Sequence, residues 1–270
     1  MLQYPPDPST IRILTLAQLC PLGSWQLALA HDRPHSLLIW MTRGQGVAMF
    51  DGRRHGLGAH NALFVPARQL VSLDVGRQGY GQAILLPLGI EMTMPEGPRH
   101  IRARDVSAQT ELTAIFEAMS REQNAERPLW HSSMDSYGQL AMIWLRRQLA
   151  ENAPHIGPET ASARLMRAYS QRLVMEHASG ETMADHANAL GVTPTHLTRV
   201  CRAETGRTAA ALLNERILHS ARSLLNNTDA AIREIAEYLG FSSAAYFTRF
   251  IQQHTGNTPS GLRDNKKRVA

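Results

Sequence analysis

The 270-residue sequence predicts an α+β protein, in which a strand-rich barrel or sandwich with two helices precedes an all-α domain with two helix-turn-helix units. Three observations predict this fold class. A chain of this length can bury two cores of ordinary domain size. Short apolar segments separated by turn residues fill residues 11–106, and one helix-turn-helix pattern occurs twice in the last hundred or so residues. We therefore expect domains over residues 1–151 and 163–270, joined by a linker over residues 152–162 that is interrupted by Pro and Gly.

The first domain begins with a Pro-rich arm over residues 1–10 and continues as a series of short strands. Residues 25–31 alternate in character, which predicts a strand with Trp25 and His31 on the same face. Further strands are expected over residues 36–42, 46–50, 62–66, 70–75 and 81–86. Asp51-Gly52 is a strong signal for a two-residue hairpin turn.

Two amphipathic helices are expected next, over residues 108–122 and 133–151. Their apolar side chains recur at helical spacing, with Leu112, Ile115, Phe116 and Met119 in the first, and Met134, Tyr137, Leu140, Ala141, Trp144 and Leu145 in the second. We expect most of this apolar surface to pack against the sheet and part of it to serve as a homodimer interface.

The second domain repeats one pattern at a nearly constant offset. Gly191 and Gly240 are 49 residues apart, and Arg199 and Arg249 are 50 apart, so the second turn holds one extra residue. Each copy places a short helix after a glycine turn, which is the arrangement that helix-turn-helix proteins use to read DNA. A long amphipathic helix over residues 208–226 should hold the two reading helices so that they enter successive major grooves, about 34 Å apart.

The outward faces of the two reading helices carry chemistry that suits a major groove. Thr193 and Pro194 should begin the first helix, and Ser242 or Ser243 should cap the second. Arg can make a bidentate contact to guanine, and Thr or Ala can contact the thymine methyl group. The predicted DNA-binding residues are Thr195, Thr198, Arg199 and Arg202 in the first helix, and Ala245, Thr248, Arg249 and Gln252 in the second.

The excess positive charge lies in the second domain. Residues 163–270 hold 14 Lys and Arg against 9 Asp and Glu, which equals the whole net charge of +5, and residues 1–162 hold 14 of each. This distribution favours double-stranded DNA as the partner of the second domain. Phosphate contacts are also possible from the tail residues Arg263, Lys266, Lys267 and Arg268.

The remaining composition favours a cytoplasmic protein. Cys20 and Cys201 are the only two cysteines, which argues against a disulfide framework or a cysteine zinc site. No segment approaches the roughly 20 apolar residues of a membrane span, and the first residues do not form a signal peptide. We expect a soluble protein without a membrane partner.

Residues 165–263 resemble the DNA-binding domain of the AraC/XylS family of bacterial transcription regulators. The resemblance is carried by residues 231–250, AIREIAEYLGFSSAAYFTRF, and residues 255–260, TGNTPS. It implies seven helices, with two recognition helices joined by a long central helix. The positions that match the family's base contacts are Thr195, Thr198 and Arg199, and Ala245, Thr248 and Arg249. Ala244 and Ala245 are less polar than is usual in the family.

The resemblance also implies a cupin-like regulatory and dimerisation domain over residues 1–151. Cupin enzymes hold a metal through a His-x-His pair, a Glu and a later His. The nearest pair here is His31 and His35, no Glu occurs between Pro21 and Ile90, and residues 64–72 lack the later His. We therefore expect no metal and no cofactor, and we expect His55 and His60 to be surface or core histidines.

The function predicted from these observations is sequence-specific transcription regulation, without enzymatic activity. A small-molecule effector is expected inside the barrel, near Trp25, His31, His35 and Trp40. RNA polymerase would be a further partner if the protein is an activator. The alternatives are a cupin-type metalloenzyme fused to a DNA-binding domain, a DNA-repair methyltransferase, which would need more cysteines, and an architectural DNA-binding protein.

Overall fold

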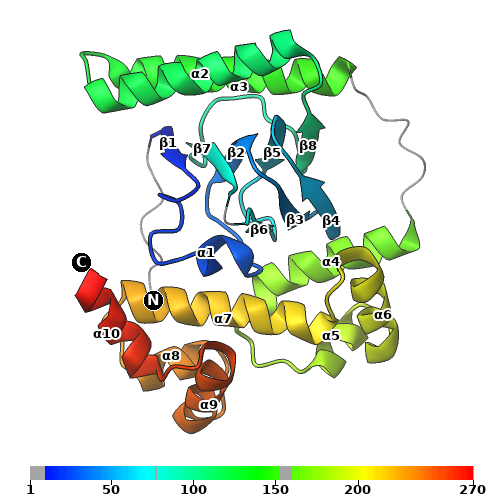
Figure 1. Ribbon diagram of the computed structural model, residues 1–270. Coiled ribbons are helices and arrows are strands. Elements are labelled where there is room, and N and C mark those ends of the chain that lie inside the picture. The colour runs from blue at the N-terminus through cyan, green and yellow to red at the C-terminus, as the bar shows by residue number, and fades with distance from the viewer. Residues whose placement is uncertain (1–9, 77, 152–159, 270) are drawn as a thin grey trace.

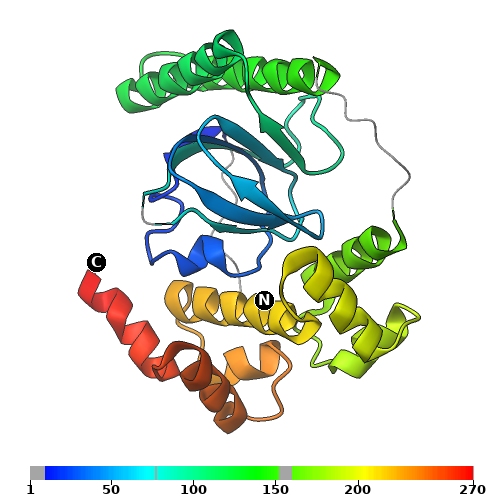
Figure 2. The same cartoon turned by 45° about the vertical axis from the view of Figure 1, so that its right-hand side comes forward.

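A computed structural model describes residues 10–76, 78–151 and 160–269 and shows the expected α+β architecture (Figure 1). Two antiparallel sheets pack face to face in the N-terminal part. Helices α2 (Val106–Ala125) and α3 (Trp130–Glu151) cover one side of this sandwich, and the helical C-terminal part lies on the opposite side (Figures 1 and 2).

The larger sheet has five strands in the order β1-β7-β2-β5-β8, and the smaller sheet has three in the order β4-β3-β6. The predicted strands over 36–42, 46–50, 62–66, 70–75 and 81–86 are confirmed as β2, β3, β5, β6 and β7. Asp51 and Gly52 have φ of 50° and 69°, as the predicted hairpin requires. The strand bounds are β1 Arg12–Thr15, β2 Ser36–Arg43, β3 Gly46–Phe50, β4 Arg53–Leu57, β5 Asn61–Val65, β6 Ser72–Asp74, β7 Tyr80–Leu86 and β8 Arg99–Arg102.

Successive side chains of β2 point to opposite faces of the larger sheet, which divides the N-terminal core into two layers. Leu37, Ile39 and Met41 face the smaller sheet and pack with Phe50 and Leu73. Leu38 and Trp40 point the other way and pack beneath α2 and α3. The space between the two sheets is therefore occupied by apolar side chains, and the layer beneath the helices is a second core.

The two helices predicted after the strands are confirmed and are each a few residues longer than expected. Trp144 is fully buried against Trp40, with their ring centroids 6.1 Å apart, and its Nε1 donates to the Ala108 carbonyl at 2.9 Å. Leu140 and Ile143 on the same helix are 47% and 42% exposed. The apolar side chains of α3 are thus divided as expected: Trp144 lies in the core, and Leu140 lies at the surface.

The strand predicted over residues 25–31 is wrong. Trp25–Ala28 forms the short helix α1, and His31 makes only an isolated bridge to Val71. The alternating pattern did not lead to a strand because Trp25 and His31 pack against helix α7 (Ala209–Asn227) of the C-terminal part, where the Trp25 and His219 rings lie 5.5 Å apart.

The described C-terminal part holds seven helices, in agreement with the number that the family resemblance implies. They are α4 Ala161–Glu176, α5 Met183–Ala189, α6 Pro194–Thr205, α7 Ala209–Asn227, α8 Ile232–Tyr238, α9 Ala244–Thr255 and α10 Pro259–Val269. α3 ends at Glu151 and α4 begins at Ala161, and most of the proposed linker, residues 152–159, lies outside the described residues. The domain bounds stay a proposal.

Candidate nucleic-acid interface

Helix α6 is the second helix of the first helix-turn-helix unit, and local sequence signals define both of its ends. The Thr193 hydroxyl accepts from the His196 amide at 3.2 Å, Pro194 occupies the first turn, and Gly206 ends the helix at φ 76°. Its inner face is formed by Leu197, Val200 and Cys201, all of which are buried.

The outer face of α6 carries the predicted contact residues. Thr195, Arg199 and Arg202 are exposed and Thr198 is half-buried. Arg199 Nη2 lies 3.0 Å from His196 Nδ1, and this contact holds the guanidinium at the surface of the helix. His196 was not among the predicted residues, because only its position one turn before Arg199 indicates this contact.

Helix α9 has the same construction in the second unit. The Ser243 hydroxyl accepts from the Tyr246 amide at 3.2 Å, and Gly256 ends the helix at φ 72°. The buried face consists of Phe247, Phe250 and Ile251. Of the two predicted caps, Ser243 forms the hydrogen bond.

The outer face of α9 is less polar than that of α6. Ala245, Arg249 and Gln252 are exposed, whereas the half-buried Thr248 donates its hydroxyl hydrogen to the Ala244 carbonyl at 2.8 Å. Tyr246 occupies the position of His196 and is 54% exposed. The sequence reasoning missed Tyr246, although its large side chain at a matched position offers both a ring and a hydroxyl to DNA.

The turns before the two recognition helices are both left-handed, with φ of 68° at Gly191 and 77° at Gly240. Their surroundings differ. A Cβ atom on Gly191 would meet nothing within 4 Å, but one on Gly240 would lie 2.4 Å from the Gly180 nitrogen. Gly180 lies between α4 and α5, so the turn of the second unit packs directly on the loop that precedes α5 in the first unit.

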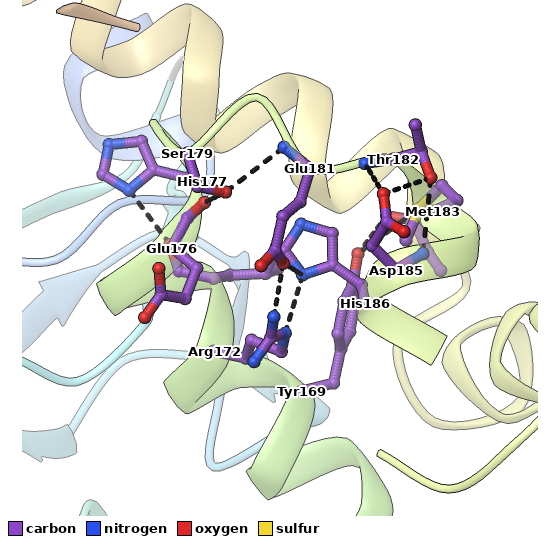
Figure 3. Close-up of polar contacts among 12 residues, drawn as sticks. Tyr169, Arg172, Glu176, His177, Ser179, Glu181, Thr182, Met183, Asp185 and His186 are labelled. Carbon is purple, nitrogen blue, oxygen red and sulfur yellow. Dashed lines mark hydrogen bonds and ion pairs between the residues drawn. The ribbon is translucent and has the colours of Figure 1, made fainter. Parts of the chain in front are cut away.

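A partly buried polar cluster holds α5 against α4 in the first unit (Figure 3). Arg172 Nε donates to His186 Nδ1 at 3.1 Å, and its Nη2 also pairs with the Glu181 carboxylate. The Tyr169 hydroxyl donates to the Ala209 carbonyl at 2.8 Å and so joins α4 to α7. Burial lowers the pKa of His186, which favours the neutral imidazole that this arrangement requires.

Helix α7 connects the two units and contributes to both of their cores. Leu212 and Leu213 pack with the first unit. Leu224 and Leu225 pack with the second. Since one continuous helix carries both cores, the spacing of α6 and α9 is set by a rigid element, as expected from the sequence.

Only part of the predicted basic tail can be placed. Arg263 Nη2 donates to the Ala230 carbonyl at 2.6 Å, which ties α10 to the turn before α8. The side chains of Lys266, Lys267 and Arg268 lie outside the described residues. Phosphate contacts by these three side chains stay a prediction.

The four residues predicted to bind an effector occupy two different places. Trp25 and His31 lie at the contact with α7, and His35 is buried near the same end of the sandwich. Trp40 lies in the layer beneath α2 and α3, where its Nε1 donates to the Thr113 hydroxyl at 3.1 Å. The structure therefore does not bring the two tryptophans together around one pocket.

The histidines considered as metal ligands are likewise dispersed. His55 stacks on Phe50 with ring centroids 4.0 Å apart, and His60 lies beside Trp40. Within residues 10–76, 78–151 and 160–269, no group of three or more His, Cys, Asp or Glu side chains is placed to hold a metal ion. None of the described helices is long and apolar enough to cross a membrane.

Comparison with known proteins finds similarity to several transcription regulators. Residues 186–265 match the family model of a helix-turn-helix domain. The chain is 27% identical over 258 residues to the HTH-type transcriptional activator RhaS of Enterobacter sp. (strain 638), covering 87% of each protein. It is 37% identical over 79 residues to the probable transcription factor PqrA of Proteus vulgaris, covering 29% of this chain and 65% of PqrA. Among solved structures, an apo variant of ToxT from Vibrio cholerae aligns with a TM-score of 0.45 at 11% identity, over 98% of this chain and 100% of that one.

Proposed function

We propose that this chain is a member of the AraC/XylS family of bacterial transcription regulators and that it reads two adjacent boxes of promoter DNA with helices α6 and α9. One observation carries the proposal. Two capped helices at opposite ends of α7 each expose an arginine at the same position of the repeat, Arg199 and Arg249. Each can make a bidentate contact to a guanine edge. We expect the rigid connection through α7 to place the two helices in successive major grooves.

The two helices should differ in how much sequence they read. α6 exposes Thr195, Arg199 and Arg202, and His196 orients Arg199. α9 exposes Ala245 and uses the Thr248 hydroxyl within the helix. We therefore expect the box under α6 to show the stronger base preference, and the box under α9 to depend on Arg249, Gln252 and Tyr246.

The N-terminal domain is proposed to be the regulatory part, which responds to a small-molecule effector. Apolar side chains fill the space between the two sheets. Trp25 and His31 of the predicted effector site instead contact α7, and through this contact an effector could pass a signal to the DNA-binding helices. An activator would also contact RNA polymerase, and the exposed Leu140 and Ile143 of α3 are proposed to form a homodimer contact.

We further propose that the protein has no enzymatic activity. The supporting observation is chemical: burial raises the pKa of the Cys201 thiol to about 12, so this cysteine is a poor nucleophile at neutral pH. Chelation of the purified protein should leave DNA binding unchanged. One tightly held transition metal per chain, together with turnover of a small substrate, would favour the metalloenzyme alternative.

Selection of bound sequences from random DNA tests the proposed function directly. The full-length protein should enrich two short boxes whose centres lie about 10 base pairs apart, which is one helical turn. Enrichment of bent or flexible DNA without a shared sequence would instead indicate an architectural protein. Repeating the selection with residues 160–270 should return the same boxes, and it separates DNA reading from regulation by the N-terminal domain.

A further inference from the structure

The side chains that helix α7 presents to the N-terminal domain include those at positions 216, 219 and 222. The Arg216 guanidinium forms an ion pair with the Asp32 carboxylate, and both side chains are 4% exposed. The His219 imidazole stacks on His31, with ring centroids 4.6 Å apart and an interplanar angle of 13°. We call this contact the α7 seam, and we define it by Trp25, His31, Asp32, Arg216, His219 and Arg222, since the Arg222 guanidinium lies 4.2 Å over the Trp25 ring.

The hydrogen bonds of the seam require a neutral His31. Its Nδ1 lies 2.8 Å from the Leu29 carbonyl and so donates, which leaves Nε2 to accept from Arg33 Nε at 3.2 Å. Because a protonated imidazole has no acceptor, it would bring two donor groups into contact at this position. Protonation of His31 therefore breaks a buried contact.

His219 is also unsuited to carry a charge in the seam. The side chain is 7% exposed, and its Nε2 lies 3.3 Å from the Gln26 carbonyl. Its Nδ1 is buried and lacks a hydrogen-bond partner within the part of the chain that the structure describes. A proton on Nδ1 would therefore be a buried, unpaired donor carrying charge.

The charges around the two imidazoles are mainly positive. Two carboxylates, Asp32 and Glu215, face a larger number of cationic and titratable groups from both domains. These are Arg33, His35 and Arg68 from the N-terminal domain, His177 from the end of α4, and Arg207, Arg216 and Arg222 from α7 and the turn before it. Burial, followed by Arg33 for His31 and by His31 for His219, lowers the pKa of both imidazoles well below the ordinary value.

We propose that the α7 seam is a proton-sensitive latch, which holds the N-terminal domain on the connecting helix while His31 and His219 are neutral and releases it on acidification. The separated state exposes both imidazoles to water, so it binds protons more readily than the closed state. Below the ordinary imidazole pKa of about 6.5, each coupled histidine should lower the ratio of closed to open molecules by up to about tenfold per pH unit. This inference does not depend on which bases α6 and α9 read.

Small-angle X-ray scattering of the full-length protein between pH 7.5 and 5 tests the latch, with far-UV circular dichroism recorded on the same samples. The radius of gyration should increase as the pH falls below about 6.5, while the helical signal stays constant. The double variant His31→Phe, His219→Phe keeps two stacked rings that cannot titrate, so it should remain compact over this range.

The matched control is His131→Phe, which removes an exposed imidazole that stacks on Trp130 of α3. This variant should expand as the wild type does. A wild-type protein that stays compact at pH 5 would overturn the proposal, and so would a double variant that expands at the wild-type pH. Loss of helical signal at the same pH as expansion would also overturn it, because the chain would then be unfolding.

A second measurement does not rely on the folding of the double variant. Histidine ¹³C NMR of the wild-type protein should show His31 and His219 titrating together, at the pH where the radius of gyration changes. Titration of both imidazoles without any change in the radius of gyration would contradict the latch, and expansion without their titration would do the same.

Discussion

A methyl group added at Gly240 should destabilise the second helix-turn-helix unit far more than the same change at Gly191 destabilises the first. Both residues have left-handed backbones, which cost a non-glycine residue about 1–2 kcal/mol. Only Gly240 is enclosed, since its Cβ would lie 2.4 Å from the Gly180 nitrogen and 2.9 Å from the Ala178 carbonyl oxygen. Overpacking of this kind costs about 1–3 kcal/mol more.

Hydrogen exchange measured by mass spectrometry resolves the two units within the full-length protein. Gly191→Ala should lower the opening free energy of α5 and α6 by about 1 kcal/mol, after the smaller entropy of the unfolded alanine chain is included. Gly240→Ala should lower the opening free energy of α8 and α9 by about 2–4 kcal/mol, which corresponds to hydrogen exchange that is roughly 30-fold to 1,000-fold faster. Equal effects of the two substitutions would refute the contact between the units, because the cost of a left-handed backbone would then explain both effects without any steric overlap at Gly240.

Two further predictions concern helix α3, which covers the sandwich, and the dependence of folding stability on pH. Leu140→Glu should weaken self-association without unfolding, because this side chain is 47% exposed, whereas Trp144→Glu should unfold the N-terminal domain, because Trp144 is fully buried. Sedimentation and circular dichroism of both variants decide this, and a folded wild-type monomer at micromolar concentration would remove the dimer claim. Burial lowers the pKa of His177 to about 4, so the unfolded chain binds more protons between pH 6.5 and 4 and stability should fall by up to about 3 kcal/mol as the pH is lowered through this range. His177→Gln should flatten the pH dependence of urea denaturation, and an unchanged slope would show that His177 is not the titrating group.

The helix-turn-helix units were predictable because their signals are local. In each unit the cap (Thr193 or Ser243), the apolar inner face and the glycine that ends the helix (Gly206 or Gly256) lie within 14 consecutive residues. The repeat at a fifty-residue offset added a second, independent copy of each signal. The outward residues followed from helical spacing alone, and the structure places Arg199 and Arg249 on exposed faces.

The α7 seam was not predictable in this way, because it depends on contacts between segments about 190 residues apart. Alternation from residue 25 to 31 suggested a strand, but Trp25 and His31 pack on α7 instead. A partner for Asp32 could not be inferred without knowing that Arg216 lies opposite. The strands β1, β4 and β8 were missed for a related reason: four of the five residues in β4 are Arg, His or Gly, and β1 and β8 are edge strands of four residues each.

The central claim is that both α6 and α9 read bases. It is tested most directly by measuring how tightly the Arg199→Ala and Arg249→Ala variants bind the selected DNA site and scrambled DNA, over a range of salt concentrations. Each substitution should cost about 1–3 kcal/mol on the selected site and relax base preference in one box only, with the two boxes about one turn apart. Lys266→Ala should weaken binding to both DNAs alike and flatten the salt dependence. If either arginine variant loses the same affinity on scrambled DNA as on the selected site, that arginine contacts phosphate, and the claim that both helices read bases is contradicted.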